Sequence, residues 1–259
     1  MELGLGLIGI GRKWGHVEKS IPSVDEVFEF LNESIKLGVR TFDTAPAYGV
    51  SEQRFGDFLK RLSSEEILSL KIATKCGEHW DSEKNNTYVD HSYDALCQSI
   101  DQSFDNLHRI DILQIHKASS QVLRDPEVKK ALNYASSKGV NIFGASISDL
   151  DAANIAIHDP MISVLQFPYN ITNKILEPIF EAAKSEGKII FINRPLGMGS
   201  VMYDKSGNLN DNNTLKTAYE TILNRNFQGV VLSGTSSIEH LKQNIQAFNS
   251  VKQSLGANV

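Results

Sequence analysis

The sequence predicts an α/β protein that folds as a single-domain (β/α)8 TIM barrel. Eight short apolar runs alternate with eight helical stretches along the chain. The runs are continuously apolar, as strands covered on both faces should be, and no linker or low-complexity tract divides the chain. The 259 residues, divided among eight units, give about 32 residues each, and a barrel of about 250 residues is typical. A doubly wound open sheet of similar length is the competing architecture.

The expected strands are short runs rich in β-branched and aromatic residues. Val230-Val231-Leu232 and Ile189-Ile190-Phe191-Ile192 are apolar throughout, which favours strands buried on both faces. In chain order the eight expected strands are Leu3–Ile10, Arg40–Thr44, Ser69–Thr74, Asp111–His116, Val140–Ser146, Ser163–Phe167, Lys188–Asn193 and Gly229–Ser233.

The expected helices are read from apolar residues at helical spacing and from end signals. The first begins after Ser23, with Glu26 three residues later as in a capping box, and stops before Gly38. The others cover Ser51–Leu62, Tyr93–Leu107, Pro126–Lys138, a segment from Asp149, Leu176–Glu186, Thr214–Asn224 and Ile238–Val251. A polar loop, Ser206–Thr214, is expected after the seventh strand. We expect one domain over residues 1–259.

Composition narrows the possible functions. With a formal net charge of −5 and 41% hydrophobic residues, the chain is typical of soluble globular proteins and not of nucleic-acid binders. No apolar run approaches the ~18 residues that span a bilayer, and the N-terminus has no basic leader. Cys76 and Cys97 form no CxxC pair, so we expect a cytoplasmic protein without disulfides. The histidines show no paired ligand spacing, so we expect no metal.

Two short motifs suggest an alternative, a short-chain dehydrogenase on a Rossmann sheet. Gly4–Gly9 matches G-x-G-x-x-G, and Tyr134 and Lys138 match Tyr-x-x-x-Lys. We interpret the glycines as close packing within the first strand, because no helix start follows them. Residues four apart on a helix are neighbours by default, so the Tyr134–Lys138 pair is weak evidence.

Polar side chains gather where three neighbouring strands end, and the carboxyl ends of barrel strands form the active site. They are Asp43, followed closely by Tyr48, then Lys75 and His116. Each alone has an ordinary structural explanation, but together they form a proton-transfer apparatus. We expect Asp43 to pair with buried Lys75, whose charge would lower the pKa of Tyr48 for general-acid work. His116 would donate a hydrogen bond to a carbonyl oxygen.

With these residues in place, the sequence resembles the aldo-keto reductase superfamily, in particular its short bacterial members. The matching stretches cover nearly the whole chain in order. They are Phe42–Gly49, Ala73-Thr74-Lys75, Leu113–His116, Gly144-Ala145-Ser146, Gln166–Asn170, Arg194–Gly197 and Gly234–Asn244. The resemblance implies a barrel that binds NADP(H), or alternatively NAD(H), and transfers a hydride between nicotinamide C4 and a carbonyl carbon.

The resemblance also implies roles for individual residues. Tyr48 would be the general acid, tuned by Lys75 and Asp43, and His116 would orient the substrate. The cofactor's phosphate would lie near the start of the last helix, where the helix dipole favours anions. The residues implied for cofactor binding are Gly11, Arg12, Ser146, Gln166, Asn193, Arg194, Leu196, Gly197, Gly234, Thr235, Ser236, His240 and Asn244.

Three positions depart from the family pattern. Ile147 stands where an asparagine often contacts the carboxamide, and Asn193 where an aromatic ring often stacks on the nicotinamide. His240 stands where an arginine often binds the 2′-phosphate, which weakens the preference for NADP(H) over NAD(H).

We expect the substrate pocket to be built from loops around the barrel mouth. These loops carry Trp14, His79, Trp80, Lys117 and the Ser206–Thr214 segment. Lys117 or Arg194 would pair with an anionic substrate group; alternatively, Arg194 serves the cofactor pyrophosphate and Lys117 is solvated.

The sequence thus predicts an NAD(P)H-dependent oxidoreductase that reduces an aldehyde or ketone to an alcohol. Its partner would be a small carbonyl compound, not a nucleic acid or a membrane. The alternatives are the short-chain dehydrogenase and a nicotinamide-binding sensor or regulatory subunit, because the resembled family includes channel-associated β subunits.

Overall fold

Eight parallel strands close into a barrel in the computed structural model, which describes residues 1–15, 20–203 and 212–256. The strands are β1 (Glu2–Gly6), β2 (Thr41–Asp43), β3 (Lys71–Cys76), β6 (Ile112–Ile115), β7 (Ile142–Ser146), β8 (Ile162–Pro168), β9 (Ile189–Asn193) and β10 (Gly229–Ser233). They pair in the order β1-β10-β9-β8-β7-β6-β3-β2, and the ring closes between β2 and β1. The predicted barrel is confirmed, and the open Rossmann sheet is excluded because this sheet has no edges.

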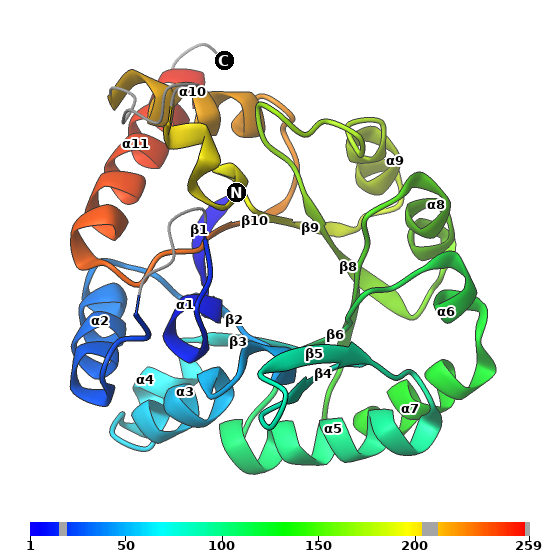
Figure 1. Cartoon of the computed structure of the whole chain (residues 1–259). Helices are drawn as coiled ribbons and strands as arrows, with labels where there is room; N and C mark the ends of the chain where they lie inside the picture. The colour runs from blue at the N-terminus through cyan, green and yellow to red at the C-terminus, as the bar shows by residue number, and fades with distance from the viewer. Residues whose placement is uncertain (16–19, 204–211, 257–259) are drawn as a thin grey trace.

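Helices surround the barrel on its outside (Figure 1). The helices of the outer layer are α2 (Val24–Lys36), α3 (Ser51–Leu59), α4 (Ser64–Leu68), α5 (Tyr93–Leu107), α6 (Ser120–Arg124), α7 (Pro126–Ser137), α8 (Leu150–His158), α9 (Ile179–Ser185), α10 (Asn212–Leu223) and α11 (Ile238–Gly256). The predicted capping box at Ser23 is confirmed, since its hydroxyl accepts from the Glu26 amide and the Glu26 carboxylate accepts from the Ser23 amide. None of the described helices has the length and apolarity needed to cross a bilayer.

The barrel interior is filled by side chains that strands alone contribute. This buried cluster consists of Ala73, Ile112, Val164, Phe191, Val230 and Leu232. A Cβ on Gly4 of β1 would lie 2.7 Å from a Val230 methyl, so a glycine here makes room for its neighbours on β10. That contact supports the close-packing interpretation for the first glycine of the G-x-G-x-x-G match. The interpretation is wrong for the other two, because a Cβ on Gly6 or Gly9 would lie no closer than 3.8 Å to any described neighbour and Gly9 belongs to α1.

The expected first strand, Leu3–Ile10, is wrong in its second half. β1 ends at Gly6, and Ile8–Gly11 form the short helix α1. The Leu7 amide still donates to the Asp43 carbonyl, at 2.8 Å, and the chain then turns so that the Arg12 amide reaches the Ile8 carbonyl. The apolar run continues through this turn because its side chains stay buried, so apolarity did not mark where the strand stops.

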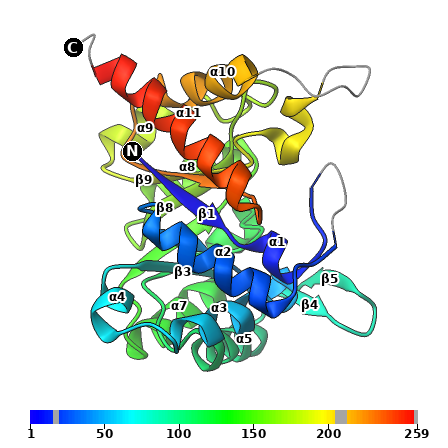
Figure 2. The ribbon, with the colours of Figure 1, turned by 90° about the vertical axis from the view of Figure 1, so that its left-hand side faces the viewer.

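The carboxyl end of the barrel carries elements that the sequence analysis did not predict. They are α1, the 3-10 turn η1 (Pro46–Tyr48), the antiparallel hairpin β4 (Glu78–Asp81) and β5 (Asn86–Val89), and η2 (Gly197–Met202). Figure 2 shows α1, the hairpin and the yellow segment that contains η2 projecting on the right-hand side, at one end of the barrel. β4 packs on η1. Most of the expected Ser206–Thr214 loop lies outside the described residues, and its last three residues begin α10.

Candidate active site

Three adjacent strands and one turn bring the four predicted proton-transfer residues together. Asp43 is the last residue of β2, Lys75 lies in β3, and His116 follows β6. Tyr48 ends η1, and its ring lies 4.9 Å from the Lys75 ammonium and 5.9 Å from the His116 ring. The sequence placed these residues at strand ends, and closure of the barrel makes them neighbours.

A buried ion pair lies at the centre of this group. Lys75 Nζ donates to Asp43 Oδ2 at 2.6 Å and to the Thr44 carbonyl at 2.9 Å, and the two charged side chains are only 1% and 3% exposed. Gln114 donates its Nε2 to the other Asp43 oxygen at 2.9 Å. Sequence reasoning missed Gln114 as a site residue, although a polar side chain inside the apolar strand Ile112–Ile115 was the available signal.

Burial and charge oppose each other at Lys75 and Tyr48. Burial is the largest single influence on Lys75 and would lower its pKa, but the charges and hydrogen bonds of Asp43 and Tyr48 together outweigh burial and the pKa is raised. Burial raises the pKa of Tyr48, and the Lys75 charge offsets only part of that rise. The expected lowering of the Tyr48 pKa is therefore wrong in net direction, because desolvation of the phenolate exceeds the attraction of the ammonium. The phenol consequently holds its proton at neutral pH.

His116 is a buried, neutral imidazole. Burial, followed by the positive charges of Lys75 and Lys117, holds its pKa well below the ordinary value of 6.5. Its Nε2 faces Oε2 of Glu78 at 3.1 Å, and its backbone carbonyl accepts from His91 Nε2 at 2.8 Å. Glu78 did not figure among the sequence-predicted site residues; a glutamate just beyond the glycine that follows β3 was the available signal.

Unpartnered amide atoms lie on the strands beside this group. Ser146 of β7 and Gln166 of β8 are register partners, and Gln166 is 1% exposed. Neither the amide nitrogen nor the amide oxygen of Gln166 has a hydrogen-bond partner within the described residues, and the same holds for Asn193 Oδ1 on β9. A buried amide with both atoms free suits a ligand group that also donates and accepts, such as a carboxamide.

Arginine and tryptophan side chains stack at the barrel mouth. The Arg12 guanidinium lies 5.4 Å from the centre of the Trp14 ring and 5.3 Å from that of the Trp80 ring. The Arg194 guanidinium also lies near Trp14, 5.6 Å from the ring centre. Gly11 packs so closely under η1 that a Cβ would lie 2.0 Å from the Tyr48 carbonyl. The structure therefore brings Arg12, Trp14 and Trp80 together next to the turn that carries Tyr48.

The remaining predicted mouth residues divide into two groups. Lys117 lies at the mouth, with its Nζ 3.8 Å from Glu78 Oε1 and its side chain half exposed. His79 points to the opposite face of β4 from Glu78 and Trp80, because side chains alternate along a strand, and it stacks on Tyr88. The structure thus does not bring His79 into the group.

The Arg194–Gly197 loop follows β9 at the same end of the barrel. Arg194 has a left-handed backbone (φ 51°), and its carbonyl accepts from Asn170 Nδ2 and from the Gly197 amide. Leu196 is partly buried against the core, while the Arg194 side chain stays exposed.

The remaining predicted cofactor residues lie in the loop after β10 and in α11. Thr235 accepts from the Ser237 amide, and Ser237 accepts from the amide of exposed His240, which orders the start of α11. Asn244 is buried and donates to the Ser233 hydroxyl, so its amide nitrogen is already engaged within the protein. Gly234 is exposed.

A cavity of about 660 Å³ lies beside this helix start. Three of its lining residues are glutamates and none is a lysine or arginine. The lining residues are Ser20, Pro22, Glu26, Glu29, Phe30, Ser236, Ser237, Ile238 and Glu239.

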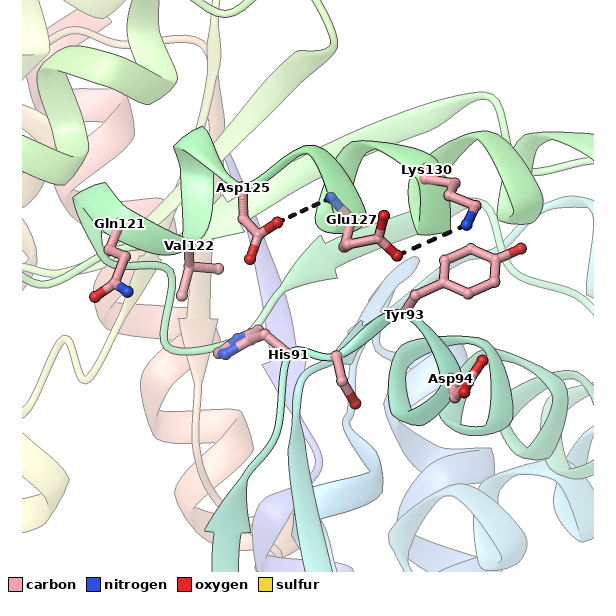
Figure 3. Close-up of a pocket in the computed structure, with 9 residues that line it drawn as sticks. His91, Tyr93, Asp94, Gln121, Val122, Asp125, Glu127 and Lys130 are labelled. Atoms are coloured by element: carbon pink, nitrogen blue, oxygen red, sulfur yellow. Dashed lines mark hydrogen bonds and ion pairs between the residues drawn. The ribbon is translucent and has the colours of Figure 1, made fainter.

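A second cavity, of about 710 Å³, lies outside the mouth, between the start of α5 and the helices α6 and α7 (Figure 3). Glu127 and Lys130 of α7 line it, together with Asp125, which caps α7 by accepting from the Glu127 amide. His91 lines it as well, and its Nε2 donates to the His116 carbonyl. None of the four proton-transfer residues lines this cavity.

The alternative site at Tyr134 and Lys138 has a structural explanation. Both side chains bind the carboxylate of Asp101, which joins α7 to α5 in the outer helical layer. The Tyr-x-x-x-Lys match therefore fastens two helices together on the outside of the barrel.

Asp43→Asn is expected to destabilise the protein strongly, because it leaves the Lys75 ammonium buried without its counter-charge. Breaking a buried pair on one side typically costs about 3–5 kcal/mol. The double variant Asp43→Asn/Lys75→Met should lose less than the single variant, since no buried charge remains. Urea unfolding of the three proteins measures this, and a single variant as stable as wild type would contradict the pair's importance.

The free energy of unfolding should fall as the pH drops below about 6.5, because the unfolded chain protonates His116 whereas the folded chain keeps it neutral. One such group contributes up to about 1.4 kcal/mol per pH unit. His116→Asn should therefore show a shallower loss of melting temperature between about pH 6.5 and 5.5. Parallel curves for the two proteins would show that His116 does not contribute.

Comparison with known proteins agrees with this architecture. The aldo/keto reductase family model matches residues 2–220. An uncharacterized oxidoreductase of Bacillus subtilis, YqkF, is 23% identical over 96% of this chain and 87% of that protein. L-galactose dehydrogenase of Arabidopsis thaliana is 26% identical, over 76% of this chain and 62% of that protein.

Solved structures share the fold over nearly the whole chain. A putative aldo-keto reductase of Pseudomonas aeruginosa superposes with a TM-score of 0.80 at 23% identity, covering 96% of this chain and 89% of that one. A glycerol dehydrogenase of Gluconobacter oxydans superposes with a TM-score of 0.76 at 18% identity, covering 98% and 90%. Because the family model matches most of the sequence and the solved structures share the fold, the chain belongs to the aldo/keto reductase family and is a carbonyl-reducing oxidoreductase.

Proposed function

We propose that the protein reduces an aldehyde or ketone to an alcohol with a nicotinamide cofactor, and that Tyr48 is the general acid. The observation that carries this proposal is the buried Asp43–Lys75 pair beside the Tyr48 phenol, at the carboxyl end of the barrel. A cofactor bound there supplies the hydride to the carbonyl carbon. The protein must supply one proton to the carbonyl oxygen.

Tyr48 is suited to that proton transfer. Its raised pKa keeps the phenol protonated before the reaction. When the proton passes to the carbonyl oxygen, the phenolate that remains lies beside the Lys75 ammonium, whose own pKa is raised by Asp43. Lys75 therefore stabilises the charge that develops on Tyr48, and Asp43 keeps Lys75 charged.

His116 and the Gln166 side chain would orient the reactants. A neutral imidazole next to the Tyr48 ring donates a hydrogen bond to the carbonyl oxygen without competing for the proton. Gln166, with both amide atoms unpartnered, and Ser146 beside it would hold the nicotinamide carboxamide. Arg12 and Arg194 both lie over the Trp14 ring at the barrel mouth and would face the pyrophosphate.

For the cofactor we propose NADP(H), with a small preference over NAD(H). His240 is a basic side chain in the first turn of α11, at the position where the family often has an arginine for the 2′-phosphate, and Thr235 and Ser236 add neutral donors. Glu239 and the other glutamates around the neighbouring cavity oppose a phosphate there. These contributions act in opposite directions, so the affinity for NADP(H) should exceed that for NAD(H) only slightly.

Tyr48→Phe should abolish carbonyl reduction, because the ring stays and the transferable proton is lost. A loss of about 10²–10⁴-fold in kcat is typical for removal of a general acid. Cofactor affinity, measured by fluorescence titration, should stay within a few-fold of wild type. Tyr134→Phe is the matched control and should keep wild-type turnover.

The assay is oxidation of NADPH or NADH with a panel of neutral, hydroxylated and anionic carbonyl compounds. The hydroxylated members are included because two relatives are named for L-galactose and glycerol. Wild-type binding of cofactor without turnover on any substrate would favour a sensor, and activity lost in Tyr134→Phe but kept in Tyr48→Phe would overturn the assignment.

His240→Arg should raise the ratio of NADPH to NADH affinity about tenfold, since a guanidinium adds a charge-assisted contact worth about 1.5–3 kcal/mol, partly screened at this exposed position. His240→Ala should bring the ratio toward one or below. Dissociation constants from fluorescence titration give both ratios, and a ratio unmoved by either change would remove position 240 from the phosphate site.

A further inference from the structure

Glu78 is a buried carboxylate inside the active site that belongs to none of the motifs carrying the family resemblance. It begins β4, the strand that packs on η1, and it is 7% exposed. Its Oε2 lies 3.1 Å from His116 Nε2, and its Oε1 lies 3.8 Å from Lys117 Nζ. Charged side chains are seldom buried unless a partner requires them, so this position calls for a physical explanation.

The His116 ring has an asymmetric environment that Glu78 creates. Nε2 faces the Glu78 oxygen at a distance within the range of a hydrogen bond, whereas Nδ1 is buried and has no partner among the described residues. A carboxylate only accepts hydrogen bonds, and a neutral imidazole carries one proton. The proton therefore belongs on Nε2.

Most of the charged groups around His116 are positive, and Glu78 is the carboxylate among them. Lys75 from β3, Lys117 after β6, Arg12 after α1 and His91 after β5 all face it with positive or ionisable groups. Tyr48 and Glu78 complete the surroundings. Without Glu78, the described surroundings of the ring would be packing contacts and cations that repel its protonated form, and no described acceptor would select which nitrogen carries the proton.

We propose that Glu78 is a positioning residue for His116: it holds the imidazole in the Nε2-protonated tautomer and fixes the plane of the ring, so that the Nε2–H facing Glu78 also lies within reach of a carbonyl oxygen in the site. This inference rests on the proposed carbonyl reduction, because it assigns Glu78 a part in orienting the substrate. A carbonyl oxygen that enters the site meets an N–H that is already formed on Nε2 and shares it with Glu78 Oε2 as a second acceptor. Such alignment matters because a displacement of about 1 Å can cost about 100-fold in rate.

The tautomer is tested without any turnover. Nitrogen-15 NMR of the imidazole at pH 7, with the His116 signals identified by their loss in His116→Asn, should show the proton on Nε2, with an Hε2 resonance shifted downfield and slow to exchange. Glu78→Leu, which removes the acceptor, should shift that resonance upfield and speed its exchange. A proton on Nδ1 in the wild type, or an Hε2 resonance unchanged in Glu78→Leu, would overturn the proposal.

The route of action is tested by a double-mutant cycle. Glu78→Gln, which keeps the shape and an acceptor oxygen but loses the charge, should lower kcat/KM for carbonyl reduction about 3- to 10-fold, and Glu78→Leu about 10- to 100-fold. In a His116→Asn background both changes should have less than a twofold effect, since the residue through which Glu78 acts is gone. The exposed Glu83→Gln, in the turn between β4 and β5, is the charge-matched control and should leave kcat/KM unchanged.

The outcomes separate this inference from the proposed function. Equal losses in both backgrounds, or a cofactor dissociation constant that rises in parallel with the loss of kcat/KM, would show a purely structural role and overturn the positioning role while Tyr48→Phe remains inactive. Loss of the proposed function itself would appear differently, as a wild-type protein that reduces none of the carbonyl compounds.

Discussion

The buried ion pair between Lys75 and Asp43 is the interaction on which the active site depends. Removing two charges from water is expensive, and the pair persists because Thr44 and Gln114 satisfy the hydrogen-bonding atoms that remain. The partners come from β2 and β3, whose positions are fixed only when the barrel closes. The Lys75 ammonium held by this pair faces the Tyr48 ring. The same ion pair therefore links two barrel strands and sets the charge beside the proposed general acid.

The same burial explains the behaviour of the neighbouring groups. Desolvation raises the pKa of Tyr48 and lowers that of His116, so both stay neutral between an ammonium on one side and a carboxylate on the other. Beside these buried groups, the mouth is built from side chains that follow α1 and from the hairpin, where the Arg12 guanidinium lies close to the rings of Trp14 and Trp80. Both amide atoms of Gln166 are buried without a hydrogen-bond partner among the described residues, as atoms that contact a ligand would be.

Much of this arrangement was predictable because a parallel barrel has simple rules. Continuous apolar runs marked the strands, and polar residues at their carboxyl ends marked Asp43, Lys75 and His116. The boundary at Gly6 was not predictable, since the buried turn of α1 has the same apolar pattern as the strand before it. The 3-10 turn and the hairpin were also missed, because short loop elements have little periodicity.

The sequence by itself determined the barrel, the order of its units and the residue types that meet at its mouth, since these follow from local patterns repeated along the chain. The tertiary structure alone decided the balance of charges within that mouth. It showed that burial outweighs the ammonium at Tyr48, that His79 points away while Glu78 points in, and that Gln114 completes the ion pair. These results depend on distances and solvent exclusion between segments far apart in the chain, and no local pattern in the sequence records either quantity.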